Sequence, residues 1–174
     1  MNLSHLPIGK KAPDVVNIVV EIPAGSKNKY EYDEEMHTIK LDRVGYTAMV
    51  YPYDYGFIPE TRSEDGDHLD AFVLLDHSVF HGCVVAGRPI GMMKMIDSGE
   101  MDEKIICVPA NDVRYDHIES LEQLSPHVTK EIQHFFEHYK DLQGKKVEIS
   151  GWFNAHEAKQ TILEAQATEA KRNA

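Results

Sequence analysis

Short apolar segments recur through the first two thirds of the chain, and glycine, proline, asparagine or aspartate separates them. Short segments rich in β-branched or aromatic residues between turn-forming residues are typical of strands. Strands at this spacing favour a sheet that closes, or nearly closes, into a barrel. The segments that we expect to be strands are residues 15–23, 29–33, 38–43, 70–76, 82–89, 91–96, 104–109 and 145–153.

A helix is predicted after most of these strands, beginning at Pro126. Ser125 is suited to cap the helix N-terminus, and proline is favoured at the first helical position because its missing N–H would have no helical partner there. Gly144 is suited to the left-handed conformation that ends many helices. Between these ends, apolar residues recur at the spacing of one helical face: Val128, Ile132, Phe135, Phe136, Tyr139 and Leu142.

A second helix is predicted in the segment that follows Asn154. Asparagine is a good N-cap, and Glu157, three residues later, can complete a capping box. The remaining residues are rich in helix formers. No repeat, low-complexity tract or linker interrupts the chain, so we expect one domain over residues 1–174, mainly β with two packed helices (an α+β fold).

The chain carries a formal net charge of −11 at neutral pH. A nucleic-acid-binding protein needs a basic face for the phosphate backbone, so this balance argues against such a partner. No apolar run approaches the roughly 18 residues that indicate a membrane span, and no membrane partner is expected. The N-terminal sequence lacks the apolar stretch of a signal peptide, so we expect a cytoplasmic protein.

The acidic segment Glu64–Asp70 is the most informative part of the sequence. Asp65, Asp67 and Asp70 fall within six residues, and Gly66 permits a sharp turn that lets their carboxylates converge. Convergent carboxylates repel one another by several kcal/mol at an effective dielectric of about 20, and a hard divalent cation would offset this repulsion. A solvated acidic turn remains the alternative. Half of an EF-hand is disfavoured because no glutamate stands at the twelfth position of such a loop.

A second acidic turn spans Asp97–Lys104 and joins two expected strands. By itself it is typical of an ordinary hairpin tip. Two acidic turns at strand ends of one small barrel can share a rim, however, and this pairing strengthens the prediction of a metal site.

Cationic side chains are interleaved with these acids. Lys29 and Glu31 are two residues apart on an expected strand, so both side chains should point to one face. Arg43 lies at the end of a short expected strand, Lys104 closes the second acidic turn, and Lys140 follows Tyr139 late in the first expected helix. A site for an anionic phosphate ester or anhydride needs this mixture, because metals neutralise some oxygens while lysine and arginine bind others.

Several motifs together resemble the soluble family I inorganic pyrophosphatases over nearly the whole chain. They occur in one order: EIPAGSKNKYE, LDR, YPYDYGFIPET, DGDHLD, GRPIGMMKMID, HFFEHYKDL and GWFNAHEA. The resemblance implies a closed β-barrel of the oligonucleotide-binding type with two packed C-terminal helices. It also implies hydrolysis of pyrophosphate to two phosphates by a metal-activated water, with about three to four Mg²⁺ ions per site and Mn²⁺ or Zn²⁺ as possible substitutes.

The resemblance also implies a role for each acidic residue of the site. Asp67 is the expected general base that takes a proton from the attacking water, and Asp70 is expected to be shared between two metals. Glu21 and Glu31 are expected as outer contributors to metal binding. The principal metal ligands that the resemblance implies are Asp65, Asp70, Asp97 and Asp102.

The substrate contacts follow from the resemblance as well. Tyr51 is expected to support the rim of the site. The residues expected to bind the phosphates are Lys29, Arg43, Tyr55, Lys104, Tyr139 and Lys140. All of these except Tyr55 also belong, with Asp67, to the implied catalytic set.

Three residues depart from the usual family pattern. His68 stands where the family most often has proline, and Tyr53 and Asp54 fill positions that are commonly smaller or uncharged. None of these departures removes an expected ligand, so they bear on pH optimum and metal preference and not on the type of reaction.

Two patterns in the sequence leave other functions open. His134, Glu137 and His138 match the HxxEH pattern of inverted zinc proteases on a predicted helix, although no later segment supplies an obvious third ligand. A non-catalytic oligonucleotide-binding-type barrel is the other alternative, and the acidic charge disfavours it.

The resemblance finally implies a homohexamer built as two stacked trimers. His134, His138 and Asp141 are spaced to lie along one helical face, apart from the aromatic residues expected to face the barrel. We therefore expect these three residues at a subunit interface.

Overall fold

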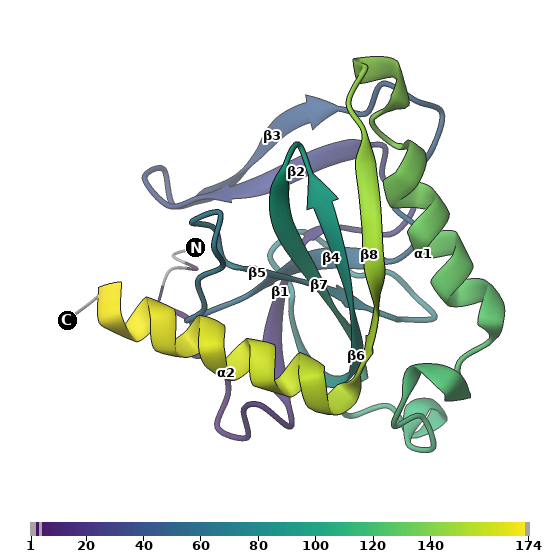
Figure 1. Ribbon diagram of the computed structural model, residues 1–174. Helices are drawn as coiled ribbons and strands as arrows, with labels where there is room; N and C mark the ends of the chain where they lie inside the picture. The colour runs from purple at the N-terminus through teal and green to yellow at the C-terminus, as the bar shows by residue number, and fades with distance from the viewer. Residues whose placement is uncertain (1–2, 4, 173–174) are drawn as a thin grey trace.

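The computed structural model describes residue 3 and residues 5–172, and in this part of the chain it has eight strands and two α-helices (Figure 1). The bounds are β1 (Val16–Ile22), β2 (Asn28–Asp33), β3 (Thr38–Val44), β4 (Asp54–Ile58), β5 (Leu69–Val73), β6 (Val84–Asp97), β7 (Glu100–Pro109), β8 (Val147–Asn154), α1 (Pro126–His138) and α2 (Ala155–Arg172), with short 3-10 helices η1 (Val113–Tyr115), η2 (Leu121–Gln123) and η3 (Asp141–Gln143).

Five strands form a ring of hydrogen-bonded neighbours in the order β1, β4, β5, β7 and β6, because β6 also pairs with β1. The β5–β7 pair is parallel, and the other pairs are antiparallel. Strand β8 pairs with β6 and adds a further strand to this sheet outside the ring. Strands β2 and β3 form a separate hairpin, which lies toward the upper left of Figure 1. The expectation of a mainly β fold with two helices is confirmed.

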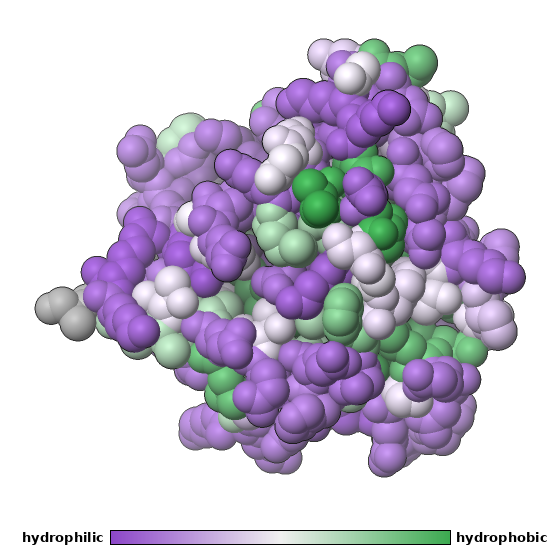
Figure 2. All heavy atoms as spheres, in the orientation of Figure 1, coloured by the Kyte–Doolittle hydropathy of each residue, from purple (hydrophilic) through white to green (hydrophobic). Residues whose placement is uncertain are grey.

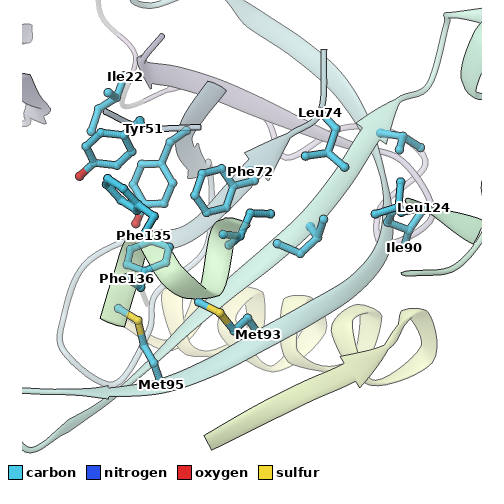
Figure 3. Close-up of a cluster of buried hydrophobic side chains, with 14 of the residues drawn as sticks. Ile22, Tyr51, Phe72, Leu74, Ile90, Met93, Met95, Leu124, Phe135 and Phe136 are labelled. Atoms are coloured by element: carbon cyan, nitrogen blue, oxygen red, sulfur yellow. The ribbon is translucent and has the colours of Figure 1, made fainter. Parts of the chain in front are cut away.

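The strands of the ring bury both faces, which explains their continuous apolar runs. In β7, Ile105 and Cys107 pack into one buried cluster, while Ile106 and Val108 pack into another. Successive side chains of a strand point to opposite faces, so each face feeds one cluster. Helix α1 contributes Phe136 to the second cluster, which Figure 3 shows, and α2 contributes residues to the first. On the face in Figure 2, hydrophilic residues cover most of the surface.

Two expectations about the strands were wrong. Strand β4 was not predicted, because Gly56 and the flanking prolines are more typical of a turn. Gly56 is required there, since a Cβ atom would lie 1.8 Å from the carbonyl oxygen of Val19 on β1. The two strands expected at 82–89 and 91–96 are one strand, β6, whose pairing with β7 shifts register between Pro89 and Gly91.

Helix α1 begins as predicted but ends earlier. The Ser125 hydroxyl accepts a hydrogen bond from the backbone N–H of His127, and Pro126 is the first helical residue. The helix ends at His138, whereas the periodicity had suggested that it continues through Leu142. Lys140 leaves the helical conformation (φ −104°, ψ 3°), and the short η3 turn follows until Gly144, at φ +68°. This early end turns Lys140 toward the strands.

Helix α2 begins with the predicted capping box. The Asn154 side chain accepts hydrogen bonds from the backbone N–H groups of His156 and Glu157, and Glu157 accepts one from the Asn154 N–H. Among the described residues, no helix is both long and apolar enough to cross a membrane.

Candidate active site

The first acidic turn has the sharp geometry that its glycine predicted. Gly66 adopts φ +90°, and the side chain of Asp65 accepts a hydrogen bond from the backbone N–H of Asp67 at 3.0 Å. The backbone N–H of Ser63 donates to the carbonyl oxygen of Asp67 at 2.8 Å. The turn leads directly into β5, so Asp65 and Asp67 lie at the end of the strand that carries Asp70.

A buried lysine joins two aspartates on β5 and β7. Because these strands are parallel and Asp70 is in register with Lys104, the two side chains meet. The Lys104 ammonium forms ion pairs with Asp70 and, at 2.6 Å, with Asp102, and only 3% of its side chain is exposed. The Tyr55 hydroxyl donates to Asp70 at 2.5 Å. Burial raises the pKa of Asp102 to about 6, although Lys104 opposes this change.

The second acidic turn is the tip of the β6–β7 hairpin. Ser98 and Gly99 both have positive φ, as a two-residue hairpin loop with this twist requires. Asp97 forms an ion pair with Lys140, and the Tyr139 hydroxyl donates to the same carboxylate at 3.4 Å. Burial alone would raise the pKa of Asp97, but the hydrogen bond and charge of Lys140 hold it below its ordinary value.

Glu21 and Glu31 lie on a third side of the site. Glu21 on β1 is 8% exposed, and its carboxylate accepts a hydrogen bond from the backbone N–H of Tyr32 at 2.6 Å. Burial raises the pKa of Glu21 to about 8, and the charges of Asp70 and Glu31 add to this effect. Lys29 and Glu31 form an ion pair, so they share one face of β2 as predicted.

These groups surround a cavity of about 530 Å³. Every residue expected in the site lines this cavity except Arg43. Arg43 is paired with Asp42 at 2.5 Å and lines a small adjacent hollow, together with Lys29, Tyr51 and Tyr139. The expected site residues that line the cavity are Glu21, Lys29, Glu31, Tyr55, Asp65, Asp67, Asp70, Asp97, Asp102, Lys104, Tyr139 and Lys140.

The cavity has a surplus of negative charge. Ten aspartates and glutamates line it, against six lysines and arginines. Partial desolvation, followed by the charges of Asp65 and Asp70, raises the pKa of Asp67. An all-oxygen set of carboxylates with unfavourable mutual repulsion suits a hard divalent cation such as Mg²⁺. The residues of the cavity therefore fit the metal that the sequence implied.

In the part of the chain that the structure describes, no three His, Cys, Asp or Glu side chains already converge as a metal-binding group. Lysine ammonium groups bridge the carboxylates instead, as Lys104 does between Asp70 and Asp102.

The three departures from the family pattern all have structural partners. The His68 ring stacks on Phe57 at 4.8 Å between centroids, and its nitrogens contact the Thr61 carbonyl at 2.8 Å and Glu34 at 3.1 Å. His68 lines the cavity. The Tyr53 hydroxyl donates to Glu131, and Asp54 is buried and accepts a hydrogen bond from Ser78; neither of the two lines the cavity.

Sequence reasoning missed Arg62 and Glu34, which also line the cavity. Arg62 donates hydrogen bonds to the carbonyl oxygen of Gly66 and to Glu34. A long cationic side chain three residues before Asp65 was the available signal, because it can fold back onto the acidic turn.

The zinc-protease alternative has no support in the described residues. The ring centroids of His134 and His138 lie 4.6 Å apart. Glu137, however, accepts a hydrogen bond from Gln133, and His138 contacts Asp141. None of these residues lines the cavity, and no third ligand joins them within residues 5–172. The acidic cavity likewise gives no support to an oligonucleotide-binding role.

The chain is similar to known proteins over most of its length. The family model for inorganic pyrophosphatase matches residues 18–170. The chain is 53% identical to an inorganic pyrophosphatase from Synechocystis over 152 residues, covering 87% of this chain and 89% of the relative. It is 52% identical to one from Saccharolobus solfataricus, covering 90% and 93%. A crystal structure of inorganic pyrophosphatase from Thermus thermophilus superposes with a TM-score of 0.94 at 46% identity, covering 98% and 99%.

Proposed function

Because the chain belongs to the inorganic pyrophosphatase family and is an enzyme that hydrolyses inorganic pyrophosphate, we propose that Asp67 is its general base and that the aspartates of the cavity hold several Mg²⁺ ions. The observation that supports this proposal best is one cavity that gathers the acids of the Asp65–Asp67 turn and of strands β1, β2, β5, β6 and β7 together with Lys29, Lys104 and Lys140. This arrangement supports both halves of the reaction, metal binding and recognition of an anion.

The metal ligands that we propose are Asp65, Asp70, Asp97 and Asp102, with Glu21 and Glu31 in outer positions. Bound Mg²⁺ supplies positive charge that offsets the charge of the substrate oxygens and lowers the pKa of water. Burial, and after it repulsion from neighbouring carboxylates, raises the pKa values of Glu21 and Asp102, and a bound cation would relieve both costs. Mg²⁺ is therefore the proposed cofactor, in about three to four copies per site, with Mn²⁺ or Zn²⁺ as substitutes.

Asp67 is suited to accept a proton. Its side chain has no ion-pair partner among the described residues, whereas Asp70, Asp97 and Asp102 each contact a lysine. The elevated pKa of Asp67 makes its carboxylate a stronger base than an ordinary aspartate. A water molecule held in the cavity would transfer its proton to a carboxylate oxygen of Asp67 as its oxygen bonds to one phosphorus atom, while the bridging P–O bond breaks and the other phosphate leaves.

The cations and tyrosines are proposed to bind the two phosphates. Burial raises the pKa values of Tyr55 and Tyr139, so both hydroxyls stay protonated and can donate hydrogen bonds. Arg43 lies beside Lys29 and Tyr139 in the adjacent hollow, from which its side chain could reach an anion in the cavity. The proposed substrate-binding set is Lys29, Arg43, Tyr55, Lys104, Tyr139 and Lys140.

The test is release of phosphate from pyrophosphate with Mg²⁺, with and without EDTA. Activity that depends on added metal is expected, because the acids need cations before an anion can bind near them. Unchanged turnover in exhaustively chelated protein would overturn the metal mechanism. A zinc-dependent peptidase assay and a low-salt nucleic-acid filter assay on the same preparation would exclude the two alternative functions.

We further propose that the five-strand ring is a closed barrel of the oligonucleotide-binding type, in one domain over residues 1–174. The pairing of β1 with both β4 and β6 supports the closed form. A cytoplasmic location remains a prediction.

A homohexamer remains a proposal as well. The side chains of His138 and Asp141 are 47% and 55% exposed and contact each other, and the His134 ring lies tilted against the His138 ring, so this face is available to a second subunit. Light scattering on the wild type and on a His134→Gln/His138→Gln variant tests the proposal. A wild-type hexamer that the double substitution weakens is expected, and a wild-type monomer would contradict it.

A further inference from the structure

Arg62 connects three separate elements at the edge of the cavity. Its guanidinium donates to the carbonyl oxygen of Gly66 at 2.8 Å, to Glu169 of α2 at 2.8 Å and to Glu34 at the tip of the β2–β3 hairpin at 3.2 Å. Only 10% of the Arg62 side chain is exposed, and 13% of the Glu169 side chain. Three acceptors from three parts of the fold thus share one partly buried guanidinium.

The base of the acidic loop is held without the Arg62 side chain. Thr61 is fully buried, and its hydroxyl donates to the carbonyl oxygen of Ile58 and accepts from the backbone N–H of Leu69. The backbone N–H of Arg62 also donates to the carbonyl oxygen of Ala165 on α2 at 2.9 Å. The loop is therefore closed at its base by buried backbone contacts.

The tip of the loop is much less supported. Asp65, Gly66 and Asp67 are exposed, and a Cβ atom built on Gly66 would meet nothing within 4 Å. The Arg62 hydrogen bond acts at this tip, on the peptide unit that joins Gly66 to Asp67. The nitrogen and Cα atoms of Asp67 belong to this peptide unit, and the Asp67 side chain starts at that Cα atom. Restraining the peptide therefore restrains the direction of the Asp67 side chain.

We propose that Arg62 is a positioning residue for Asp67 and that Glu169 anchors it to α2. This inference rests on the proposed role of Asp67 as base. A planar guanidinium presents several donors in a fixed fork, so it can hold Gly66, Glu34 and Glu169 in one geometry. Lysine keeps the charge but has no such fork. Small errors in the position of a catalytic group reduce turnover strongly.

The experiment compares Arg62→Lys with the wild type and with a control, Arg114→Lys. Arg114 also pairs with an aspartate, Asp112, but it is 58% exposed and lies outside the cavity. Two kinds of measurement are made: steady-state kinetics, which give kcat and KM for Mg²⁺-pyrophosphate, and hydrogen exchange of residues 61–68 in metal-free protein. Exchange reports the bonded N–H groups of Ser63, Gly66 and Asp67 directly.

For Arg62→Lys we expect kcat to fall roughly tenfold while KM stays within about twofold, since the proposed substrate contacts lie on other elements. Exchange of the loop should become faster, while exchange of β5 and β7 stays unchanged. Glu169→Gln, which keeps an acceptor oxygen but loses the charge, should show the same pattern with a smaller loss of kcat. Arg114→Lys should match the wild type in every measurement.

Wild-type kcat and loop exchange in Arg62→Lys would overturn the proposal. A rise in KM alone would do so too, because it would indicate a direct substrate contact, and so would a lower kcat with unchanged loop exchange. If Arg62→Lys does not fold, Glu169→Gln decides by the same criteria. A wild-type protein without Mg²⁺-dependent activity would instead overturn the proposed function, and loop exchange would still test whether Arg62 holds the turn.

Discussion

The two parts of the cavity wall hold their carboxylates in different ways. On β5 and β7, Asp70 and Asp102 are fixed by strand pairing and share the buried Lys104. On the acidic turn, Asp65 and Asp67 are exposed and lie on a loop whose tip is held by a few hydrogen bonds. In the proposed mechanism the lysine-paired strand aspartates bind metal, and of the two turn aspartates Asp65 binds metal while Asp67 accepts the proton.

The largest effect on stability is expected for a substitution in the part of the cavity wall that β5 and β7 form. Lys104→Met removes the ammonium group that pairs with Asp70 and Asp102. The two carboxylates then lack a cationic partner, so the unfolding free energy of the metal-free protein should fall. Removing one partner of a buried pair costs about 3–5 kcal/mol, and we expect about 3 kcal/mol because Asp70 is 28% exposed. Urea denaturation in EDTA at fixed protein concentration measures this change.

Lys94→Met is the matched control for that substitution. Lys94 also pairs with an acid across two strands, Glu103, but its side chain is 28% exposed. A loss below about 1 kcal/mol is expected, as for other partly exposed pairs. Equal losses in the two variants would mean that burial does not distinguish the Lys104 pair.

Asp67→Asn should have the largest effect on activity. The substitution keeps the shape of the side chain but removes the base, so kcat should fall by about 10²-fold or more while metal binding is largely retained. Asp70→Asn should weaken metal binding as well, because Asp70 is a proposed shared ligand. Steady-state kinetics measure kcat and Mg²⁺ titration measures metal binding, with the surface substitution Asp116→Asn as control. Full activity of Asp67→Asn at neutral pH would refute the proposal that Asp67 is the general base.

Stability of the metal-free protein should depend on pH through Glu21. Burial raises the pKa of this carboxyl from 4.5 to about 8 in the folded protein. Between these values the folded state binds a proton that the unfolded state does not, so the unfolding free energy should fall as pH rises, by at most about 1.4 kcal/mol per pH unit. Glu21→Gln should flatten this dependence in urea titrations in EDTA from pH 4.5 to 8; an identical slope would rule out Glu21 as its source.

The smallest effect is expected on the exposed hairpin. Lys40 and Asp33 form an ion pair at 2.5 Å, as close as the buried pairs, but the Lys40 side chain is 48% exposed. Solvent screens such pairs, so Lys40→Gln should leave the thermal midpoint unchanged, which thermal denaturation measures. A clear loss of stability would show that burial does not decide how much an ion pair contributes to the stability of this protein.

Much of the fold and site could be predicted from local signals in the sequence. Gly66 between two aspartates predicted a sharp acidic turn, and Ser125 and Asn154 marked the starts of both helices, because capping and turn formation depend on adjacent residues. The order of motifs along the whole chain also indicated the family. Strand β4 escaped, because its Gly56 satisfies a contact with β1 that no local pattern reveals.

Tertiary structure alone decided which charges meet. Asp70 contacts Lys104 because two strands pair in parallel register, and Asp97 contacts Lys140 because α1 ends early enough to turn that lysine inward. Arg62 reaches Glu169, 107 residues further along the chain, only because α2 packs beside the acidic loop. Local sequence determines the turns and caps, since these depend on neighbouring backbone groups. Pairing between distant side chains depends on strand register and helix packing, which the whole chain sets together.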